Sequence, residues 1–253
     1  MGLGMRGEVW KPQLDGLQDH CQLLHFDNRG IGESDDIGGF LSMRDMARDA
    51  ARVLDAAGWH EDVHLVGVSM GGMISQELAL LRQERFASLT LVATHAGGPK
   101  SWVPPAKGLL RFLSVHLGPA AKRTESMAKL LYPQHFLESY DTDLLHERMS
   151  FQMGRRPNPK SVRKQLAAIR KHDTRDRLGD IRLPTLIIKP ELDILVHPRH
   201  SDRLHHGIKH ADMMTLPHAG HGLIFQCAEE VNERLLEHFG TAGSGRQSAS
   251  GQP

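Results

Sequence analysis

A serine flanked by glycines offers the clearest chemistry in this sequence. Gly67-Val68-Ser69-Met70-Gly71 follows an apolar stretch and precedes a helical pattern of apolar residues. On a tight turn from strand to helix, the hydroxyl projects above the sheet edge, and small residues two positions away on either side avoid collisions. The N-terminus of the following helix also favours negative charge that develops beside the serine. The pattern therefore predicts Ser69 as a nucleophile.

A serine hydroxyl is a weak nucleophile and needs a general base that a carboxylate holds in place. Both partners follow Ser69 in the sequence, each in a loop after a predicted strand: Asp193 after residues 185–189 and His221 after residues 212–216. The carboxyl ends of parallel strands lie at one edge of a sheet, where catalytic groups gather. We therefore predict that Ser69 attacks a carbonyl, that His221 accepts its proton, and that Asp193 orients the imidazole.

Two nearby residues are alternatives for the base and the acid. Glu191 is two residues closer to the predicted strand than Asp193, and His218 precedes His221 by three residues. The small residues on either side of His221 favour it, because they let the loop pass close to the serine. Glu191 stays open as the acid and His218 as the base.

The elements that position these residues alternate between apolar segments and helical patterns, which is typical of βα units on a parallel sheet. We therefore predict an α/β fold with a mostly parallel sheet. Its strands are predicted at residues 22–27, 63–69, 89–94, 185–189 and 212–216. Helices are predicted at residues 42–57, with Ser42 as the N-cap, at 70–82 and at 229–239.

The pattern changes between residues 98 and 178, where helical segments and proline-containing breaks replace strands. We interpret this stretch as a helical cap inserted between two strands of one sheet. Residues 1–97 and 179–239 then form the two parts of the core. Residues 240–253 are rich in Gly, Ser, Gln and Ala and contain no large apolar residue, so we predict a disordered tail.

Four motifs together resemble the α/β-hydrolase superfamily, in its branch with a helical cap. They are the Asp-Asn-Arg-Gly-Ile-Gly-Glu-Ser run at residues 27–34, the turn at Ser69, the Pro-Thr-Leu-Ile-Ile run at 184–188 leading to Asp193, and the Ala-Gly-His-Gly run at 219–222. The resemblance spans residues 1 to about 239. Residues 69–76 look like those of small-molecule esterases and enol-lactonases of this group. Pro190 stands where the family usually has glycine, and the motif around Arg29 resembles a structural turn of the family.

The resemblance implies hydrolysis of an ester-like bond in a small-molecule substrate, without metal or organic cofactor. Related epoxide hydrolases and dehalogenases carry aspartate at the position of Ser69, so the serine disfavours them. A cofactor-free perhydrolase or a C–C bond hydrolase uses the same triad and stays open. The alternative from a different class is a non-enzymatic product, either ligand-binding or unstable, that keeps the triad but lacks a working oxyanion hole.

Residues 2–7, Gly-Leu-Gly-Met-Arg-Gly, match the dinucleotide-binding pattern G-x-G-x-x-G, and Asp27 follows 20 residues later. A dinucleotide-binding site requires a strand directly before the glycines, and no residues precede them that could form one. It would also leave Ser69, Asp193 and His221 unexplained. By resemblance, the same glycines fit the family's oxyanion loop after its third strand, with the N–H groups of Leu3 and Met70 as donors. We therefore expect the first three strands of the family to be absent and a gap to separate residues 22–27 from 63–69.

Charge and composition exclude several partners. Lys and Arg number 31 against 30 Asp and Glu, which argues against nucleic acid or anionic membrane as the main partner. No apolar run approaches the ~18 residues of a membrane span, and no signal peptide is recognisable.

The cysteines Cys21 and Cys227 fit a reducing compartment, so we expect a cytoplasmic protein. The histidines at 197, 200, 205, 206 and 210 lack a metal-binding motif and are expected on the surface. The sequence makes no prediction of oligomeric state.

Overall fold

Four parallel strands form the sheet at the centre of the molecule. The computed structural model describes residues 1–36, 38–119, 122–153 and 157–249. The strands are β1 (Val63–Val68), β2 (Phe86–Val92), β3 (Thr185–Pro190) and β4 (Ala211–Leu216), and they lie in the order β1-β2-β3-β4. All neighbours are parallel. The predicted α/β class and four of the five predicted strands are confirmed.

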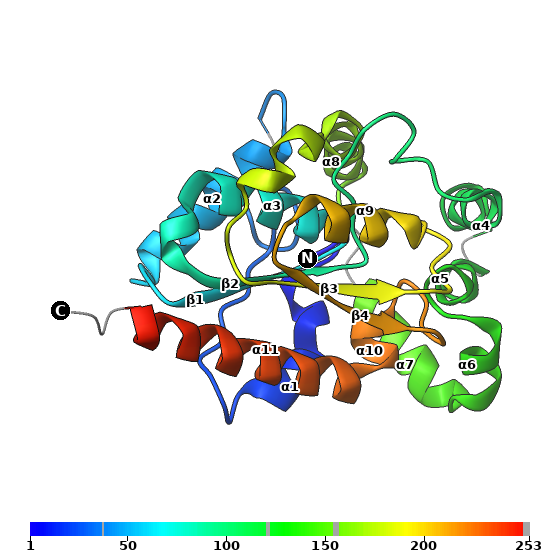
Figure 1. Cartoon of the computed structure of the whole chain (residues 1–253). Helices are drawn as coiled ribbons and strands as arrows, with labels where there is room; N and C mark the ends of the chain where they lie inside the picture. The colour runs from blue at the N-terminus through cyan, green and yellow to red at the C-terminus, as the bar shows by residue number, and fades with distance from the viewer. Residues whose placement is uncertain (37, 120–121, 154–156, 250–253) are drawn as a thin grey trace.

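Helices cover both faces of this sheet (Figure 1). On one face lie α2 (Met43–Ala56), α3 (Met70–Arg82) and α9 (Arg199–Gly207). On the other lie α1 (Lys11–Leu17), α10 (Leu223–Gln226) and α11 (Ala228–Ala249). Short 3-10 helices occupy Gly7–Trp10, Gln83–Arg85 and Arg175–Asp180. The molecule is thus a three-layer sandwich, the usual arrangement for a parallel sheet whose two faces must both be buried.

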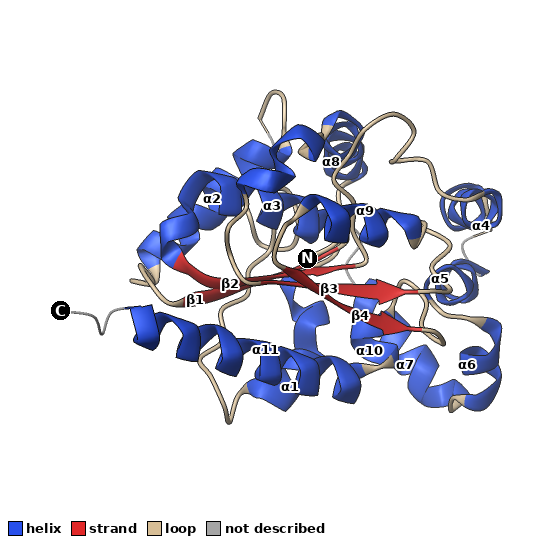
Figure 2. Cartoon of the chain, in the orientation of Figure 1, coloured by secondary structure: helices blue, strands red, loops and turns tan. Residues whose placement is uncertain are grey.

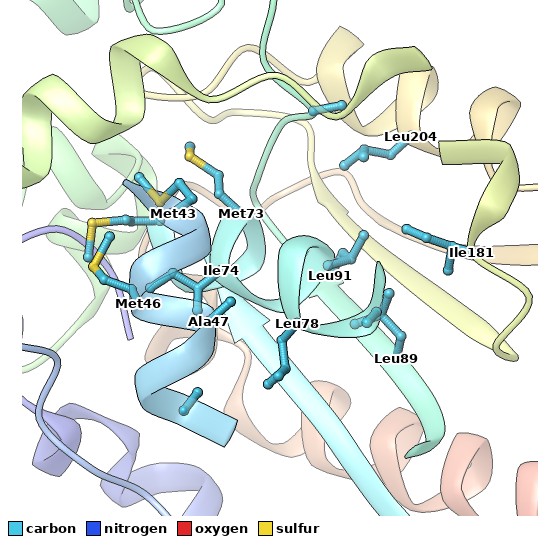
Figure 3. Packing of buried hydrophobic residues seen from close by; sticks show 14 of the residues in the cluster. Met43, Met46, Ala47, Met73, Ile74, Leu78, Leu89, Leu91, Ile181 and Leu204 are labelled. Carbon is cyan, nitrogen blue, oxygen red and sulfur yellow. The ribbon is translucent and has the colours of Figure 1, made fainter. Parts of the chain in front are cut away.

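The strands contribute to two apolar clusters, one on each face, because successive side chains of a strand point to opposite sides. Leu89 and Leu91 of β2 pack with α2, α3 and α9, as Figure 3 shows. Val92 of β2 and Ile188 of β3 pack on the other face, with residues of α1, α10 and α11. Burial on both sides explains why these strands appear in the sequence as nearly continuous apolar runs.

Helix α2 illustrates how local sequence determines an element. The Ser42 hydroxyl accepts a hydrogen bond from Asp45 N at 3.1 Å, and the Asp45 carboxylate accepts one from Ser42 N at 3.1 Å. This reciprocal capping box satisfies two backbone donors at the helix start. The buried face of the helix repeats at helical spacing and consists of Met43, Met46, Ala47, Ala50 and Leu54. The predicted helix and its N-cap are confirmed.

A helical insertion separates β2 from β3. Its helices are α4 (Ala106–Leu117), α5 (Arg123–Leu131), α6 (Gln134–Ser139), α7 (Thr142–Met153) and α8 (Pro159–Lys171). Helices α4 to α7 lie beyond the carboxyl ends of β3 and β4, toward which the strand arrows point in Figure 2. Helix α8 lies apart from them, on the side of the sheet that carries α3 and α9 (Figure 1). The described residues of this insertion contain helices and loops but no strand of the sheet.

The predicted strand at residues 22–27 is wrong: this segment is an irregular loop. Its residues 22–26 have no backbone hydrogen-bond partner in the described part of the chain. A cavity of about 580 Å³, lined by residues of both, lies between this segment and β1. A strand exists only where a neighbouring backbone completes its ladder. β1 has β2 as a partner on its other edge, whereas residues 22–26 have no such neighbour among the described residues. The absence of the family's first three strands stays a prediction.

The last helix, α11, extends further than the sequence predicts. It continues through residues 240–249, for which the Gly- and Ser-rich composition predicts a disordered tail. Glycine and serine are weak helix formers, but a helix already nucleated by packed turns propagates more easily than it starts. Ala242 is still buried. Residues 250–253 lie outside the described residues. Among the described residues, no helix is long and apolar enough to cross a membrane.

Candidate active site

Ser69 occupies the turn between β1 and α3 in a strained backbone conformation. Its φ of 55° and ψ of −120° lie where residues other than glycine are rare. A Cβ on Gly67 would lie 2.5 Å from Gly71 O, and one on Gly71 would lie 2.8 Å from Met1 N. The Thr94 hydroxyl donates a hydrogen bond of 2.7 Å to Ser69 O and holds the turn from β2. The glycines are therefore required sterically, as the sequence analysis argues.

Asp193 and His221 meet through a short hydrogen bond. Asp193 Oδ2 lies 2.6 Å from His221 Nδ1, and the aspartate side chain is fully buried. The other oxygen, Oδ1, accepts hydrogen bonds from Leu195 N at 2.7 Å and Val196 N at 2.9 Å. These contacts fix the carboxylate, which in turn favours the His221 tautomer with its proton on Nδ1. Nε2 is then the nitrogen that can accept a proton.

The structure places both alternative residues elsewhere. Lys189 Nζ lies 2.9 Å from Glu191 and 2.8 Å from Asp202, so Glu191 belongs to a surface ion-pair group. His218 is half exposed, and its Nε2 lies 3.2 Å from Glu230 Oε1. Neither residue joins the pair of Asp193 and His221.

All three predicted catalytic residues come after the carboxyl ends of strands in the chain. The strand arrows in Figure 2 mark these ends. Ser69 follows β1, Asp193 follows β3, and His221 follows β4. In the part of the chain that the structure describes, the Ser69 hydroxyl forms no hydrogen bond to His221. Nucleophile–base bonds are often long without substrate and tighten when it binds.

The N-terminal turn lies against the predicted nucleophile. A Cβ on Gly2 would lie 3.5 Å from Ser69 Cβ and 3.9 Å from its Oγ. Gly4 adopts a φ of +66°, which suits glycine, and turns the chain away from the serine. Within the described residues, neither Leu3 N–H nor Met70 N–H donates a hydrogen bond. Both predicted oxyanion donors are thus uncommitted beside Ser69.

No sequence pattern predicted a role for Gln165, which holds this turn in place. Gln165 is fully buried on α8; its Oε1 accepts a hydrogen bond of 3.0 Å from Gly4 N, and its Nε2 donates one of 3.4 Å to Arg29 O. The residue lies in a basic, polar stretch that looks like a solvated helix face. The available signal was the helical spacing of Ser161, Gln165 and Ala168, which are all buried.

The apparent dinucleotide motif at residues 2–7 has a structural role. Asp27, which that motif would assign to a ribose, accepts a hydrogen bond of 2.6 Å from Gly7 N. Arg29 donates through Nε to Asp49 at 2.8 Å and joins the turn to α2. These contacts tie the N-terminal segment to the loop at residues 27–34 and commit the Asp27 carboxylate to the protein backbone.

His200 contradicts the expected surface position of the histidine cluster. It is 4% exposed, and its ring lies 5.5 Å from that of His95, which lies 6.2 Å from His172. Desolvation lowers the pKa of His95 to about 3 and those of His172 and His200 to about 4. The prediction failed because α9 is amphipathic and turns His200 inward. His197, His206 and His210 are exposed.

Residues 2–226 match the family model for the alpha/beta hydrolase fold, a span that includes the turn at Ser69 and the pair of Asp193 and His221. The chain belongs to this family. It is a hydrolase, and the resemblance drawn from the sequence is confirmed at the level of family and fold.

Relatives and solved structures cover nearly the whole chain. A protein of Azorhizobium caulinodans named "Putative carbamate hydrolase RutD" is 32% identical over 94% of this chain and 89% of its own length. A solved hydrolase from Pseudomonas aeruginosa is 26% identical, covers 94% of this chain and 87% of its own, and has a TM-score of 0.78. An enol-lactonase from Burkholderia xenovorans, at 22% identity and a TM-score of 0.79, shares the fold over 94% of this chain and 88% of its own.

Proposed function

We propose that this hydrolase cleaves an ester-like bond of a small molecule, either a carboxylic ester or a carbamate, through Ser69, His221 and Asp193. The observation that carries the proposal is the 2.6 Å hydrogen bond between Asp193 and His221 at the sheet edge that presents Ser69. The relatives named as carbamate hydrolases support including carbamates. A carbamate presents the same electrophilic carbonyl carbon as an ester.

In the first half of the reaction, Ser69 Oγ attacks the substrate carbonyl carbon while His221 Nε2 accepts the hydroxyl proton. The buried Asp193 carboxylate stabilises the resulting imidazolium through the bond to Nδ1. His221 then donates the proton to the leaving oxygen or nitrogen, and the carbonyl–leaving-group bond breaks. The product of this half is an acyl or carbamoyl ester of Ser69.

In the second half, a water molecule attacks the same carbonyl carbon and His221 again accepts the proton. The Ser69 oxygen leaves, takes the proton back, and an acid is released. Each tetrahedral intermediate carries negative charge on the former carbonyl oxygen. We assign its stabilisation to the N–H groups of Leu3 and Met70, because both are uncommitted and lie beside Ser69.

The proposed chemistry proceeds with side chains and backbone donors alone, so it requires no metal or organic cofactor. We also propose that the helical insertion, part of which lies beyond the carboxyl ends of β3 and β4 (Figure 1), acts as a cap and shapes the substrate pocket. We also propose a cytoplasmic location, which the free cysteines Cys21 and Cys227 support. The substrate is a small molecule, since the near balance of charges favours no nucleic acid.

The test is a hydrolysis assay with matched nitrophenyl esters and nitrophenyl carbamates. We expect the unaltered protein to release nitrophenol from one or both series and Ser69→Ala to lower kcat by about 10⁴-fold or more. Ser139→Ala, an exposed serine on α6, is the matched control and should keep the full rate. Equal rates for Ser69→Ala and the unaltered protein would contradict the proposal.

A further inference from the structure

A histidine, a cysteine and a glutamate converge outside the proposed catalytic site. His218 lies in the loop after β4, Cys227 joins α10 to α11, and Glu230 belongs to the first turn of α11. His218 Nε2 lies 3.4 Å from Cys227 Sγ and 3.2 Å from Glu230 Oε1. The three possible ligand atoms all lie within 4.8 Å of one another.

These separations match the edges of a tetrahedral zinc site. Zinc–ligand bonds to sulfur, nitrogen and oxygen at the tetrahedral angle imply edges of about 3.6 Å between S and N and about 3.4 Å between N and O. The observed distances of 3.4 Å and 3.2 Å are each about 0.2 Å shorter. The third edge, between the ligand atoms of Cys227 and Glu230, is no longer than 4.8 Å, so side-chain adjustment would bring the three atoms around one ion.

We propose that His218, Cys227 and Glu230 bind one zinc ion, with solvent as the fourth ligand. The donor set of imidazole, thiolate and carboxylate suits this borderline-soft cation. Cys227 is buried and forms the floor of the site, whereas His218 and Glu230 are half exposed and leave a path for the ion from solvent.

The backbone around His218 is already fixed. Gln226 Nε2 donates a hydrogen bond of 2.8 Å to His218 O, and Gln226 Oε1 accepts one of 3.0 Å from Gly220 N. This bracing lowers the conformational cost of arranging the ligands. A bound ion would cross-link the loop that carries His221 to the start of α11. It would act on structure, apart from the proposed reaction at Ser69.

Binding involves one proton release and no redox change. Zinc binds cysteine as the thiolate. As the metal–sulfur bond forms, the S–H bond breaks and the proton passes to solvent.

Cobalt(II) and zinc titrations of chelator-treated, full-length protein test the proposal. We expect one ion per chain, visible absorption typical of tetrahedral cobalt, and a thiolate-to-cobalt charge-transfer band that zinc abolishes. Cys227→Ser should remove the charge-transfer band. His218→Ala and Glu230→Gln, which change exposed side chains, should weaken zinc binding at least tenfold while the fold persists.

The matched controls are Cys21→Ser, at the other free cysteine, and Glu229→Gln, an exposed glutamate beside Glu230. Both should bind zinc like the unaltered protein, and so should Ser69→Ala, which separates this test from that of the proposed function. The proposal is overturned if no charge-transfer band forms, or if His218→Ala and Glu230→Gln bind zinc as tightly as the controls.

Discussion

The geometry around His221 favours this side chain over His218 as the proposed general base. Its Nδ1 is held by buried Asp193, whereas His218, three residues earlier, contacts Glu230 instead. His221→Ala should therefore lower kcat at least ~10³-fold more than His218→Ala, with intact folding shown by circular dichroism. A comparison of single-turnover rates measures this difference. If His218→Ala proves the more damaging change, the assignment of base is reversed.

Gln165 should influence catalysis without touching the substrate. Its bond to Gly4 N fixes the turn that contains Leu3 N–H. Losing one oxyanion donor costs ~10²–10³ in kcat, so a loosened donor in Gln165→Leu should cost about tenfold or more. KM should change little, and Gln165→Glu, which keeps the acceptor, should recover part of kcat. Arg163→Ala, on the exposed side of α8, is the control. A loss confined to KM would contradict the positioning role.

Some helices and strands can be predicted from local sequence patterns alone. Strands buried on both faces, such as β2, are apolar throughout, and α2 carries both an N-cap and a helical repeat. The turn at Ser69 is predictable from the sequence because only glycine fits at positions 67 and 71, where any side chain would collide with the backbone. Residues 22–27 have the same apolar pattern as a strand, but pairing depends on a neighbour that local sequence does not reveal. Gln165 and His200 were missed because long-range packing determines their burial.

Three buried histidines near the carboxyl ends of the strands should make stability depend on pH. The pKa values of His95, His172 and His200 are lowered to about 3, 4 and 4, whereas an unfolded histidine titrates near ~6.5. Between these values the unfolded chain binds more protons than the folded chain. The free energy of unfolding should therefore fall as the pH drops from about 6.5 to 4.

Urea unfolding at pH 7, 6 and 5 measures this dependence. Neither ring nitrogen of His172 meets a hydrogen-bond partner in the described structure, so His172→Leu should flatten the pH profile and leave stability at pH 7 nearly unchanged or higher. His210→Leu, at an exposed histidine, is the control and should keep the original slope. Identical slopes for both variants would show that burial of His172 does not couple folding to protonation.

At the scale of the whole molecule, the sheet has an open edge at the cavity beside β1. The edge strand β1 borders the cavity on one side and the unpaired residues 22–26 border it on the other. Met1 also lines the cavity. The Met1 amino group is buried, and desolvation lowers its pKa to about 6. An apolar extended segment would pair with β1, fill the cavity and replace this amine with an amide.

We therefore predict that fusing an apolar strand of ~5–6 residues to Met1 through a short turn raises Tm. A few kcal/mol of added stability corresponds to roughly 5–10 °C for a chain of this size. A fusion of equal length made of Gly and Ser is the control, since it adds chain without apolar surface or β propensity. Differential scanning calorimetry compares the two, and equal Tm values would show that the cavity does not accept a strand.

The most direct test of the central claim is covalent labelling of Ser69. A fluorophosphonate reacts with a serine only where a base and an oxyanion site activate the hydroxyl. We predict that it labels the full-length protein once and that peptide mass mapping places the label on Ser69. Labelling should disappear in Ser69→Ala and fall strongly in His221→Ala. A label on another residue, or one that survives Ser69→Ala, would contradict the assignment of this chain as a serine hydrolase acting through Ser69.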